Sequence, residues 1–445
     1  MADAAPGAPD AAVTAHLVAR RARLLGPAYR LFYDEPFHPV RGDGVWLYDA
    51  AGTPWLDAYN NVVCVGHAHP RVVEAIARQA AVLNTHTRYL HDGILDYAER
   101  LLATMPAALG HATFTCTGSE ANDLALRIAG AHTGGTGLVV TRWAYHGVTS
   151  ALACASPSLG AHVRLGDHVR LVDAPSGGDA DTGRRFAEGV RAAIADLRAH
   201  GLKPAALMVD TVFSSDGVFT GPAGFLAEAV AAIREAGGVF IADEVQPGFG
   251  RTGEAFWGFQ RHGVVPDIAT LGKPMGNGHP VAGLAVRPDV MRAFGQASRY
   301  FNTFGGNPVS MAAAAAVLDV IEDERLQCNA LAVGNYLRER LAALAERHAL
   351  VGEVRGAGLF VAVELVSDRA TRAPATAQAA RVVNALRRRQ VLLSATGPHA
   401  HVLKIRPPLV FRREHADLLV QRLDDVLGEL DRGDAPARAS GRTAG

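Results

Sequence analysis

The stretch Gly238-Val-Phe-Ile-Ala-Asp-Glu-Val-Gln246 joins an apolar run to an acidic end. Its apolar part has the length and composition of a short buried strand, so Asp243 is predicted at the carboxyl end of that strand. A second run of this kind, Asp267-Ile-Ala-Thr-Leu271, ends just before Lys273. The distance from Asp243 to Lys273 suits one strand–helix–strand unit, which predicts that the acid and the amine lie at neighbouring strand ends.

The same pattern of strand, glycine-rich turn and helix recurs from about residue 112 onward. Further short apolar strands are predicted at Ala112–Cys116, Gly137–Val140 and Ala205–Val209, with helices at Phe186–His200 and Gly224–Ala236. Short apolar strands that alternate with helices are typical of a mainly parallel sheet covered on both faces. We therefore predict an α/β fold for the central part of the chain.

The two ends of the chain have a different pattern. Residues 44–57 read as a β-hairpin around a glycine turn, and the part after about residue 325 mixes long helices with strands such as Leu359–Leu365. We predict an N-terminal segment of a small domain at 1–57 and a large domain at 58–324. The rest of the small α+β domain is predicted at 325–431, followed by a disordered tail at 432–445.

Composition narrows the class of protein. The chain has 445 residues, 49% of them hydrophobic and 20% charged, and a formal net charge of zero. With no net charge, the protein has no overall electrostatic attraction to nucleic acid or to an anionic membrane. No apolar run is long enough to span a membrane. The N-terminus lacks a signal-peptide pattern, and the four cysteines are widely spaced. A soluble, two-domain, cytoplasmic protein is expected.

Lys273 is a rare residue type in this chain. Among 44 Lys and Arg residues, only Lys203, Lys273 and Lys404 are lysines. Lysine can lose its proton and form a Schiff base with a carbonyl, whereas the guanidinium of arginine stays protonated. Lys273 also lies on a glycine-rich loop and not on a charged helix face. A surface loop residue is the alternative, and the surroundings of Lys273 decide between the two.

Two further features support a cofactor site beside Lys273. Thr117-Gly118-Ser119 joins a strand to a helix start, where free N–H groups and the helix dipole can bind a phosphate. Tyr145 and His146 follow another strand and offer an aromatic face for a ring. Asp243 could keep a pyridine nitrogen protonated, which makes pyridoxal phosphate an electron sink. Each feature alone has an ordinary structural alternative, such as a helix cap or core packing.

Two motifs point elsewhere and are set aside. Gly248-Phe-Gly-Arg-Thr-Gly253 matches the dinucleotide pattern, but an aromatic, glycine-broken segment follows it in place of a helix. His67 and His69 have the spacing of metal ligands, but no third ligand is evident nearby. We therefore predict neither a dinucleotide site nor a metal site.

Taken together, the residues resemble the class III (ω-amino-acid type) aminotransferases of pyridoxal-phosphate fold type I. The resemblance runs from about Gly44 to about Val426. The matching stretches are Thr117-Gly-Ser-Glu-Ala-Asn122, Tyr145-His-Gly147, Ala242-Asp-Glu-Val-Gln246, Gly248-Phe-Gly-Arg-Thr-Gly253, Leu271-Gly-Lys273, Asn302-Thr-Phe-Gly-Gly-Asn307 and Arg355-Gly-Ala-Gly358. This resemblance implies a large domain with a sheet of the seven-stranded type, the cofactor pyridoxal 5'-phosphate and a homodimer.

The resemblance also implies roles for single residues. Lys273 would form the Schiff base with the cofactor and later move the proton, and Asp243 would pair with the pyridinium nitrogen. The remaining implied contacts are Val245 on one ring face, Tyr145 or His146 on the other, Gln246 at the ring hydroxyl, Gly118 and Ser119 at the phosphate, Thr303 from the second subunit, and Arg406 at a substrate carboxylate.

Three functions remain open at this point. The leading hypothesis is an aminotransferase that moves an amino group from an amino acid or amine to a small 2-oxo acid of the pyruvate, glyoxylate or 2-oxoglutarate type. The alternative is a phospho-lyase acting on an amino-alcohol phosphate such as ethanolamine phosphate, because Asn84–Asp92, Lys273–Pro280 and Leu403–Pro408 resemble the branch that holds both activities. A catalytically silent binding domain is the third.

One segment departs from the familiar pattern. Many relatives carry Glu-Pro after the strand before Asp243, whereas this chain has Asp210-Thr-Val-Phe-Ser-Ser215. This loop and Asn84–Tyr89 are expected to border the active site, and neither identifies the amino donor.

Overall fold

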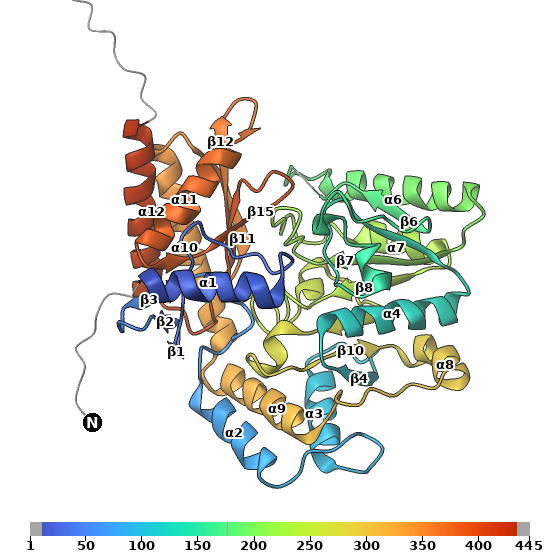
Figure 1. Cartoon of the computed structure of the whole chain (residues 1–445). Coiled ribbons are helices and arrows are strands. Elements are labelled where there is room, and N and C mark those ends of the chain that lie inside the picture. The colour runs from blue at the N-terminus through green and yellow to red at the C-terminus, as the bar shows by residue number, and fades with distance from the viewer. Residues whose placement is uncertain (1–10, 176, 434–445) are drawn as a thin grey trace, which may run out of the picture.

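The computed structural model describes residues 11–175 and 177–433, and Figure 1 shows them as two halves joined side by side. The larger half contains a seven-stranded sheet made of β4 (His111–Thr115), β5 (Gly137–Thr141), β6 (Val169–Val172), β7 (Pro204–Asp210), β8 (Val239–Asp243), β9 (Ile268–Leu271) and β10 (Ala282–Val286). The order is β4-β10-β9-β8-β7-β5-β6. Only β10 runs antiparallel to its neighbours, so the predicted mainly parallel sheet is confirmed.

Helices cover both faces of this sheet. On one face α4 (Gly118–Thr133) packs with α8 (Pro288–Ala297), and on the other lie α6 (Thr182–Ala199) and α7 (Ala227–Glu235). Alternate strand residues enter the two layers: Met208 and Ile241 join the cluster under α4, whereas Leu207 and Phe240 join the cluster under α6 and α7. The strands are therefore buried on both sides, as their apolar sequences predict.

Sequence reasoning missed β6 and β10. β10 reads Ala-Gly-Leu-Ala-Val, and alanine and glycine are weak strand formers, so its conformation comes from pairing with β9 and β4. The link from β8 to β9 also differs from the expected strand–helix–strand unit. Its regular structure is the short 3-10 helix η2 (Gly258–His262), because the glycine-rich stretch before it forms successive turns.

The smaller half combines both ends of the chain. The predicted hairpin is present as β2 (Trp46–Tyr48) and β3 (Pro54–Asp57), flanked by β1 (Arg41–Asp43), and β3 pairs in parallel with β14 (Val391–Leu392). A second sheet contains β11 (Val351–Ala357), β12 (Phe360–Asp368), β13 (Ala373–Pro374), β15 (Ser394–Thr396) and β16 (Val402–Ile405). The division of the chain after residues 57 and 324 remains our proposal, and the pairing of β3 with β14 supports it.

The helices of the smaller half are α10 (Leu326–Arg347), α11 (Thr376–Arg388) and α12 (Arg413–Gly433). The predicted tail starts too early, because α12 continues to Gly433. Its last turns are held to α10 through His348, whose ring nitrogens lie 2.6 Å from carboxylate oxygens of Asp424 and Asp431. The remaining predicted tail, residues 434–445, lies outside the described residues, as do residues 1–10.

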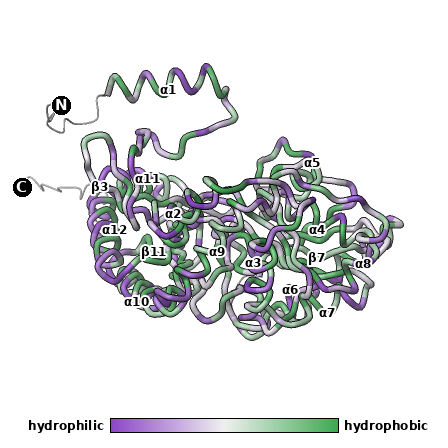
Figure 2. Tube along the Cα trace, turned by 90° about the horizontal axis from the view of Figure 1, so that it is seen from below, coloured by the Kyte–Doolittle hydropathy of each residue, from purple (hydrophilic) through white to green (hydrophobic). Residues whose placement is uncertain are grey.

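Three more helices lie together below the sheet in Figure 1: α2 (Pro70–Ala80), α3 (Asp92–Ala103) and α9 (Pro308–Asp323). The short helices are α5 (Ser150–Ala153), η1 (Pro157–Leu159) and η3 (Lys273–Gly276). Helix α1 (Ala11–Leu25) stands off from the rest, as Figure 2 shows. Within the described ranges, no helix has both the length and the apolar character needed to cross a bilayer.

The discounted dinucleotide motif has a structural role. Arg251, in its middle, is 1% exposed and donates from Nη1 to the carbonyl oxygens of Leu359 (2.9 Å) and Pro407 (2.8 Å). Burial lowers the pKa of its guanidinium to about 9. Because both acceptors belong to the smaller half, this arginine joins the two halves.

Candidate active site

The site lies where β7, β8 and β9 end. Asp210 and Asp243 are partners in the register of β7 and β8, and Asp243 is opposite Thr270 on β9. Lys273 begins η3 two residues after β9. Carboxyl ends of parallel strands are the usual ligand position in open α/β sheets, and here they bring the predicted acid and amine to one edge.

Asp243 is held in one orientation. It is 4% exposed, and its Oδ2 accepts from Asn122 Nδ2 (2.9 Å) and lies 2.8 Å from His146 Nδ1, while Oδ1 accepts from the backbone N–H of Val245 (3.1 Å). Asn122 is itself fixed by Thr270, whose Oγ1 donates to Asn122 Oδ1 at 2.5 Å. Buried hydrogen bonds of this kind stabilise the ionised carboxylate and its direction.

Lys273 has the opposite environment. The described residues give its Nζ no hydrogen bond and no ion pair. Burial and then the charge of Arg406 lower the pKa of its amine to about 8, although Asp243 and Asp210 oppose this. At pH 7 roughly 9% of the amine is then neutral, against roughly 0.03% for an ordinary lysine. A buried amine with a lowered pKa is suited to act as a nucleophile and as a base.

The start of α4 presents free backbone donors. A capping box is present: the Glu120 N–H donates to Thr117 Oγ1 (3.1 Å), and the Thr117 N–H donates to Glu120 Oε2 (2.9 Å). In the described part of the chain, the N–H groups of Gly118 and Ser119 have no such partner. Gly118 also packs against Val245: a Cβ there would lie 3.0 Å from a methyl group of that valine. The helix start and the Val245 face thus form adjoining walls.

One cavity brings these groups together. It is lined by Gly118, Ser119, Asn122, Tyr145, His146, Gly147, Asp210, Asp243, Val245, Gln246 and Lys273. In this cavity the acid matches the pyridine nitrogen of pyridoxal phosphate, and the amine matches its aldehyde. The free N–H donors match the phosphate, and the apolar wall matches the ring. The residues present therefore fit this cofactor.

Tyr145 and His146 have different surroundings in the cavity wall. His146 is 3% exposed and bound to Asp243, so it lies at the edge of the acid, whereas Tyr145 is 37% exposed at the cavity wall. Burial raises the pKa of the Tyr145 phenol. Of the two side chains, Tyr145 is the more exposed one.

Two predicted residues do not line the cavity. Arg406 is buried behind it and donates from Nη1 to Asn61 Oδ1 and Gln246 Oε1 (2.9 Å), and its guanidinium lies over the Tyr59 ring at 4.5 Å. Thr303 lies on an exposed segment. His67 and His69, set aside as metal ligands, pair separately with Asp57 (2.8 Å) and Glu324 (3.1 Å).

Sequence reasoning missed Asn122 and Asp210 as site residues. Asn122 lies one helical turn after Gly118, so helix periodicity could have placed it on the same face. Asp210 was noted only within an unfamiliar loop, and its alignment with Asp243 needs the register of β7 and β8. Burial and then the charge of Asp243 raise the pKa of Asp210.

Glu244 has a structural task beside the site, and its loss should destabilise the fold. This side chain is fully buried and accepts from Thr211 Oγ1 (2.7 Å) and from the backbone N–H groups of Gly258 (2.7 Å) and Phe259 (2.8 Å). Glu244→Ala leaves these donors unpaired and should cost roughly 3–5 kcal/mol. Urea unfolding measures this, with the exposed Glu235→Ala as control. Equal midpoints would contradict the assignment.

Comparisons with known proteins show the family of this chain. The pattern of the family "Aminotransferase class-III" matches residues 33–427. An alanine–glyoxylate aminotransferase 2-like protein of Drosophila melanogaster is 42% identical over 89% of this chain and 84% of its own length. A protein of Caenorhabditis elegans named ethanolamine-phosphate phospho-lyase homolog 1 is 36% identical over 96% of this chain and 97% of its own.

Among solved structures, a phospholyase from Arthrobacter in complex with phosphoethanolamine matches with a TM-score of 0.90 and 45% identity, over 93% of this chain and 99% of that one. An amine transaminase from an uncultivated Pseudomonas species in its PLP-bound form matches with a TM-score of 0.81 and 31% identity, over 89% and 95% of the two chains. The chain belongs to the class III aminotransferase family. It is a pyridoxal-phosphate-dependent enzyme of the transaminase type.

Proposed function

We propose that this enzyme transfers an amino group from an amino acid or amine to a small 2-oxo acid of the pyruvate, glyoxylate or 2-oxoglutarate type. The observation that carries the proposal is the pair formed by Lys273 and Asp243: an amine with a lowered pKa faces one cavity with a carboxylate held by two side chains. Bound pyridoxal phosphate supplies an aldehyde for this amine and a ring that withdraws electrons from the substrate Cα.

The roles of the other residues follow from their positions. Asp243 would accept the ring N–H of the bound cofactor, and Asn122 and His146 hold the carboxylate in its direction. Gly118 and Ser119 would donate backbone N–H groups to the phosphate, and Val245 and Tyr145 would cover the two ring faces. Gln246 Nε2 gives one hydrogen to Ser214 Oγ (2.7 Å), and its second hydrogen is left for the ring hydroxyl.

At the substrate, Lys273 Nζ would take the proton from Cα and deliver it to the carbon that the cofactor aldehyde supplies, so that the amino group stays with the cofactor. The neutral form of Lys273, favoured by burial, is the form that can accept this proton. Arg406 is proposed to hold a substrate carboxylate. Its Nε is buried without a partner in the described part of the chain, which leaves donor capacity on that guanidinium.

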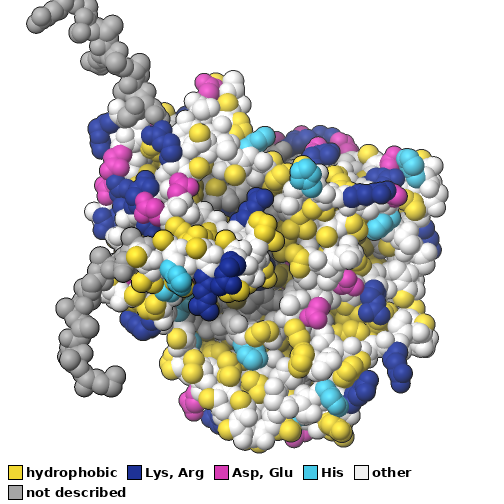
Figure 3. Space-filling view, in the orientation of Figure 1, with side chains coloured by type: hydrophobic (Ala, Val, Ile, Leu, Met, Phe, Trp, Pro, Cys, Tyr) yellow, Lys and Arg dark blue, Asp and Glu magenta, His cyan; other side chains and the backbone are white. Residues whose placement is uncertain are grey.

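A homodimer is part of the proposal, with Thr303 of each chain completing the phosphate site of its partner. Apolar side chains beside it are exposed in the single chain, and these are Tyr89, Leu90, Phe301 and Phe304. Hydrophobic side chains are also frequent around the centre and lower part of the face in Figure 3. Exposed apolar groups of this kind favour burial against another chain. The cytoplasmic location stays a prediction, since two relatives are named as mitochondrial.

The test of amino transfer is spectroscopic. An amino donor alone should remove the visible absorbance of the bound cofactor, and a 2-oxo acid added afterwards should restore it. A panel of donors and acceptors identifies the substrates. If no donor changes the spectrum while the protein holds its cofactor, amino transfer is excluded.

The pH dependence of cofactor loading follows from the pKa of Lys273. Only the neutral amine attacks an aldehyde, and the neutral fraction rises until the pH passes the pKa of about 8. The loading rate of cofactor-free protein should therefore rise roughly tenfold per pH unit below pH 8 and level off above it. Absorbance after mixing with pyridoxal phosphate measures this rate. A rise that continues to about pH 10 would show an unshifted amine.

A second function is favoured by the likeness to the Arthrobacter phospholyase. In this reaction Lys273 Nζ again takes the proton from Cα, and the C–O bond on the neighbouring carbon breaks, so that phosphate leaves with the bonding pair. Release of phosphate from ethanolamine phosphate with no 2-oxo acid present would select it. Absence of that release, with amino transfer observed, would reject it.

A further inference from the structure

The loop that carries Lys273 is held against a distant part of the chain by the side chain of Asn277. This asparagine directly follows η3, and its Oδ1 accepts from the Val65 N–H at 3.0 Å. Its Nδ2 donates to the Gly66 carbonyl oxygen at 2.8 Å. One amide group therefore bonds a backbone donor and a backbone acceptor at once, and it fixes the end of the short helix that begins with the amine.

The backbone at Asn277 indicates that this side chain has a task. Its φ of 50° and ψ of 42° lie in the left-handed region, where glycine is the least strained residue. Both neighbours, Gly276 and Gly278, are glycines, and Gly278 also has a positive φ of 100°. Glycine would fit the backbone at position 277 with less strain than asparagine. The asparagine there adds the two hydrogen bonds that glycine could not make.

The segment that Asn277 binds is itself held in place. The Leu409 N–H donates to the Cys64 carbonyl oxygen at 2.6 Å, and Gly44 and His67 exchange backbone hydrogen bonds at 3.1 and 2.8 Å. Gly66 packs so closely that a Cβ on it would lie 3.2 Å from the Gly44 Cα. These contacts come from both ends of the chain. They give η3 a fixed surface to rest on.

Two more neutral contacts hold the loop of η3. The buried Cys64 Sγ donates to the Pro274 carbonyl oxygen at 3.2 Å, and burial raises the pKa of this thiol to about 12, so the donor keeps its proton. η3 also packs against α9, where the His279 Nε2 lies 3.0 Å from Ser310 Oγ. Burial lowers the pKa of His279, so this imidazole is neutral above pH 7.

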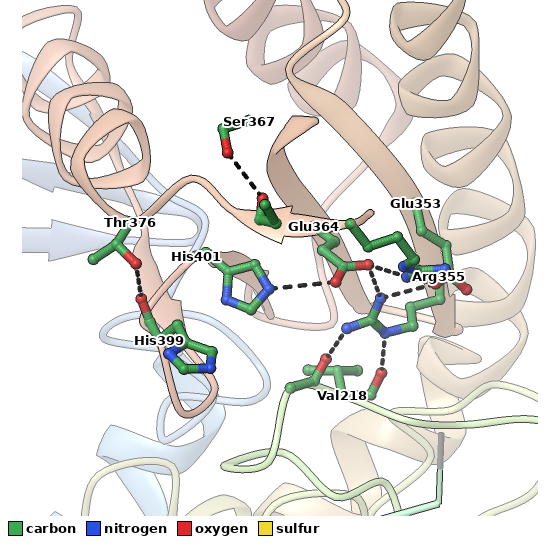
Figure 4. A network of polar contacts seen from close by, with 11 residues as sticks. Val218, Glu353, Arg355, Glu364, Ser367, Thr376, His399 and His401 are labelled. Carbon is green, nitrogen blue, oxygen red and sulfur yellow. Dashed lines mark hydrogen bonds and ion pairs between the residues drawn. The ribbon is translucent and has the colours of Figure 1, made fainter. Parts of the chain in front are cut away.

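The loop after β7, which begins at Asp210 in the cavity wall, is held in a different way. Arg355 donates to the Val218 carbonyl oxygen at 2.8 Å and is ion-paired with Glu353 and Glu364, as Figure 4 shows. That wall is secured by a network of charges, whereas neutral groups attach η3 to the segment at 64–66. If the amide at position 277 were lost, the described part of the chain would keep one hydrogen bond between these two segments, from the thiol.

We propose that Asn277 is a positioning residue for Lys273. Through its bonds to the backbone of Val65 and Gly66 it holds η3, and with it the direction and the burial of the amine. Asn277 does not line the cofactor cavity, so it acts through the loop and does not touch the reacting atoms. The inference rests on the proposed role of Lys273 at the cofactor.

Loosening of η3 should raise the pKa of Lys273. Burial is the main cause that lowers this pKa, followed by the charge of Arg406, while Asp243 and Asp210 oppose the shift. A substitution of Asn277 removes none of these charged groups. Water admitted beside the amine stabilises its ammonium form. The pKa should therefore move from about 8 toward the ordinary lysine value of about 10.4.

The test measures this pKa in the cofactor-free protein. Trinitrobenzenesulfonate reacts with neutral amines, and peptide mass spectrometry reads the labelling of each lysine from about pH 6 to about pH 11. In the native chain the labelling rate of Lys273 should be half-maximal near pH 8. In Asn277→Gly this midpoint should rise by roughly one pH unit or more. The exposed Lys203 should keep its midpoint in both proteins.

The variants separate the side chain from the backbone. Asn277→Gly deletes both bonds and suits the left-handed backbone, and Asn277→Ala, which deletes the same bonds, should give the same direction of shift. The matched control is Arg325→Gly, because Arg325 is exposed and also has a φ of 50°. It should keep the native midpoint. Cys64→Ala removes the thiol contact alone and should cause a smaller rise.

Circular dichroism and urea unfolding of the same samples show whether each variant is folded. Equal Lys273 midpoints in the native chain and in the folded Asn277 variants overturn the inference. An equal rise in Arg325→Gly also overturns it, since that would show a general loosening of the fold. If the native chain forms no absorbing adduct with pyridoxal phosphate, the proposed role of Lys273 fails. The labelling midpoint still decides whether Asn277 positions this amine, because it is measured without the cofactor.

Discussion

Lys273→Ala should lower kcat by about 10⁴-fold or more, because one side chain supplies both the nucleophile and the base. The variant loses the amine that attacks the cofactor aldehyde, and no other amine is available to replace it. The two remaining lysines do not line the cavity: Lys203 is exposed, and Lys404 is buried on β16. Turnover and the visible absorbance of the cofactor measure the loss.

The matched control for this variant is Lys203→Ala, which removes the same side chain from an exposed position. It should keep the native kcat and spectrum. A small primary amine added to Lys273→Ala should restore part of the proton transfer, since the alanine leaves space in the cavity. Turnover of Lys273→Ala at more than a few per cent of the native rate would remove Lys273 from the mechanism.

Asp243→Asn has the second largest expected effect. The change preserves shape but removes the negative charge that would keep the ring nitrogen protonated, and removing such a preorganised electrostatic partner typically costs about 10²- to 10³-fold in kcat. It also places an amide NH₂ group against the donors Asn122 Nδ2 and His146 Nδ1, at 2.9 and 2.8 Å from Asp243 Oδ2. Cofactor affinity should therefore fall as well.

Asp267→Asn is the control for Asp243→Asn. Asp267 is buried at the opposite end of β9, where its carboxylate accepts from the Phe240 N–H (2.8 Å) and Arg234 Nε (3.1 Å). This variant should lose stability but keep kcat within about threefold when folded. Steady-state kinetics and cofactor titration on both variants make the comparison, and equal losses of kcat would show that Asp243 acts only through the fold.

The parts of the fold that depend on local sequence patterns were predictable from the sequence. The strands that contain Asp243 and precede Lys273 are short apolar runs with turn signals beyond them, and the structure has β8 and β9 there. β10 was not predictable, because its alanine and glycine content is uninformative and β4, one of its two neighbours, is distant in sequence. The chain of bonds from Thr270 through Asn122 to Asp243 likewise depends on residues more than a hundred positions apart.

Sequence by itself determined the chemistry available to this protein: a rare lysine on a glycine-rich loop, an acid at a strand end, and a helix start with small residues. The tertiary structure decided how these groups behave. It placed His146 against Asp243, left Tyr145 at the cavity wall and lowered the pKa of Lys273. The physical reason is that burial and electrostatic neighbours belong to positions in space, and distant parts of the chain meet only when the strands pair and the two halves pack.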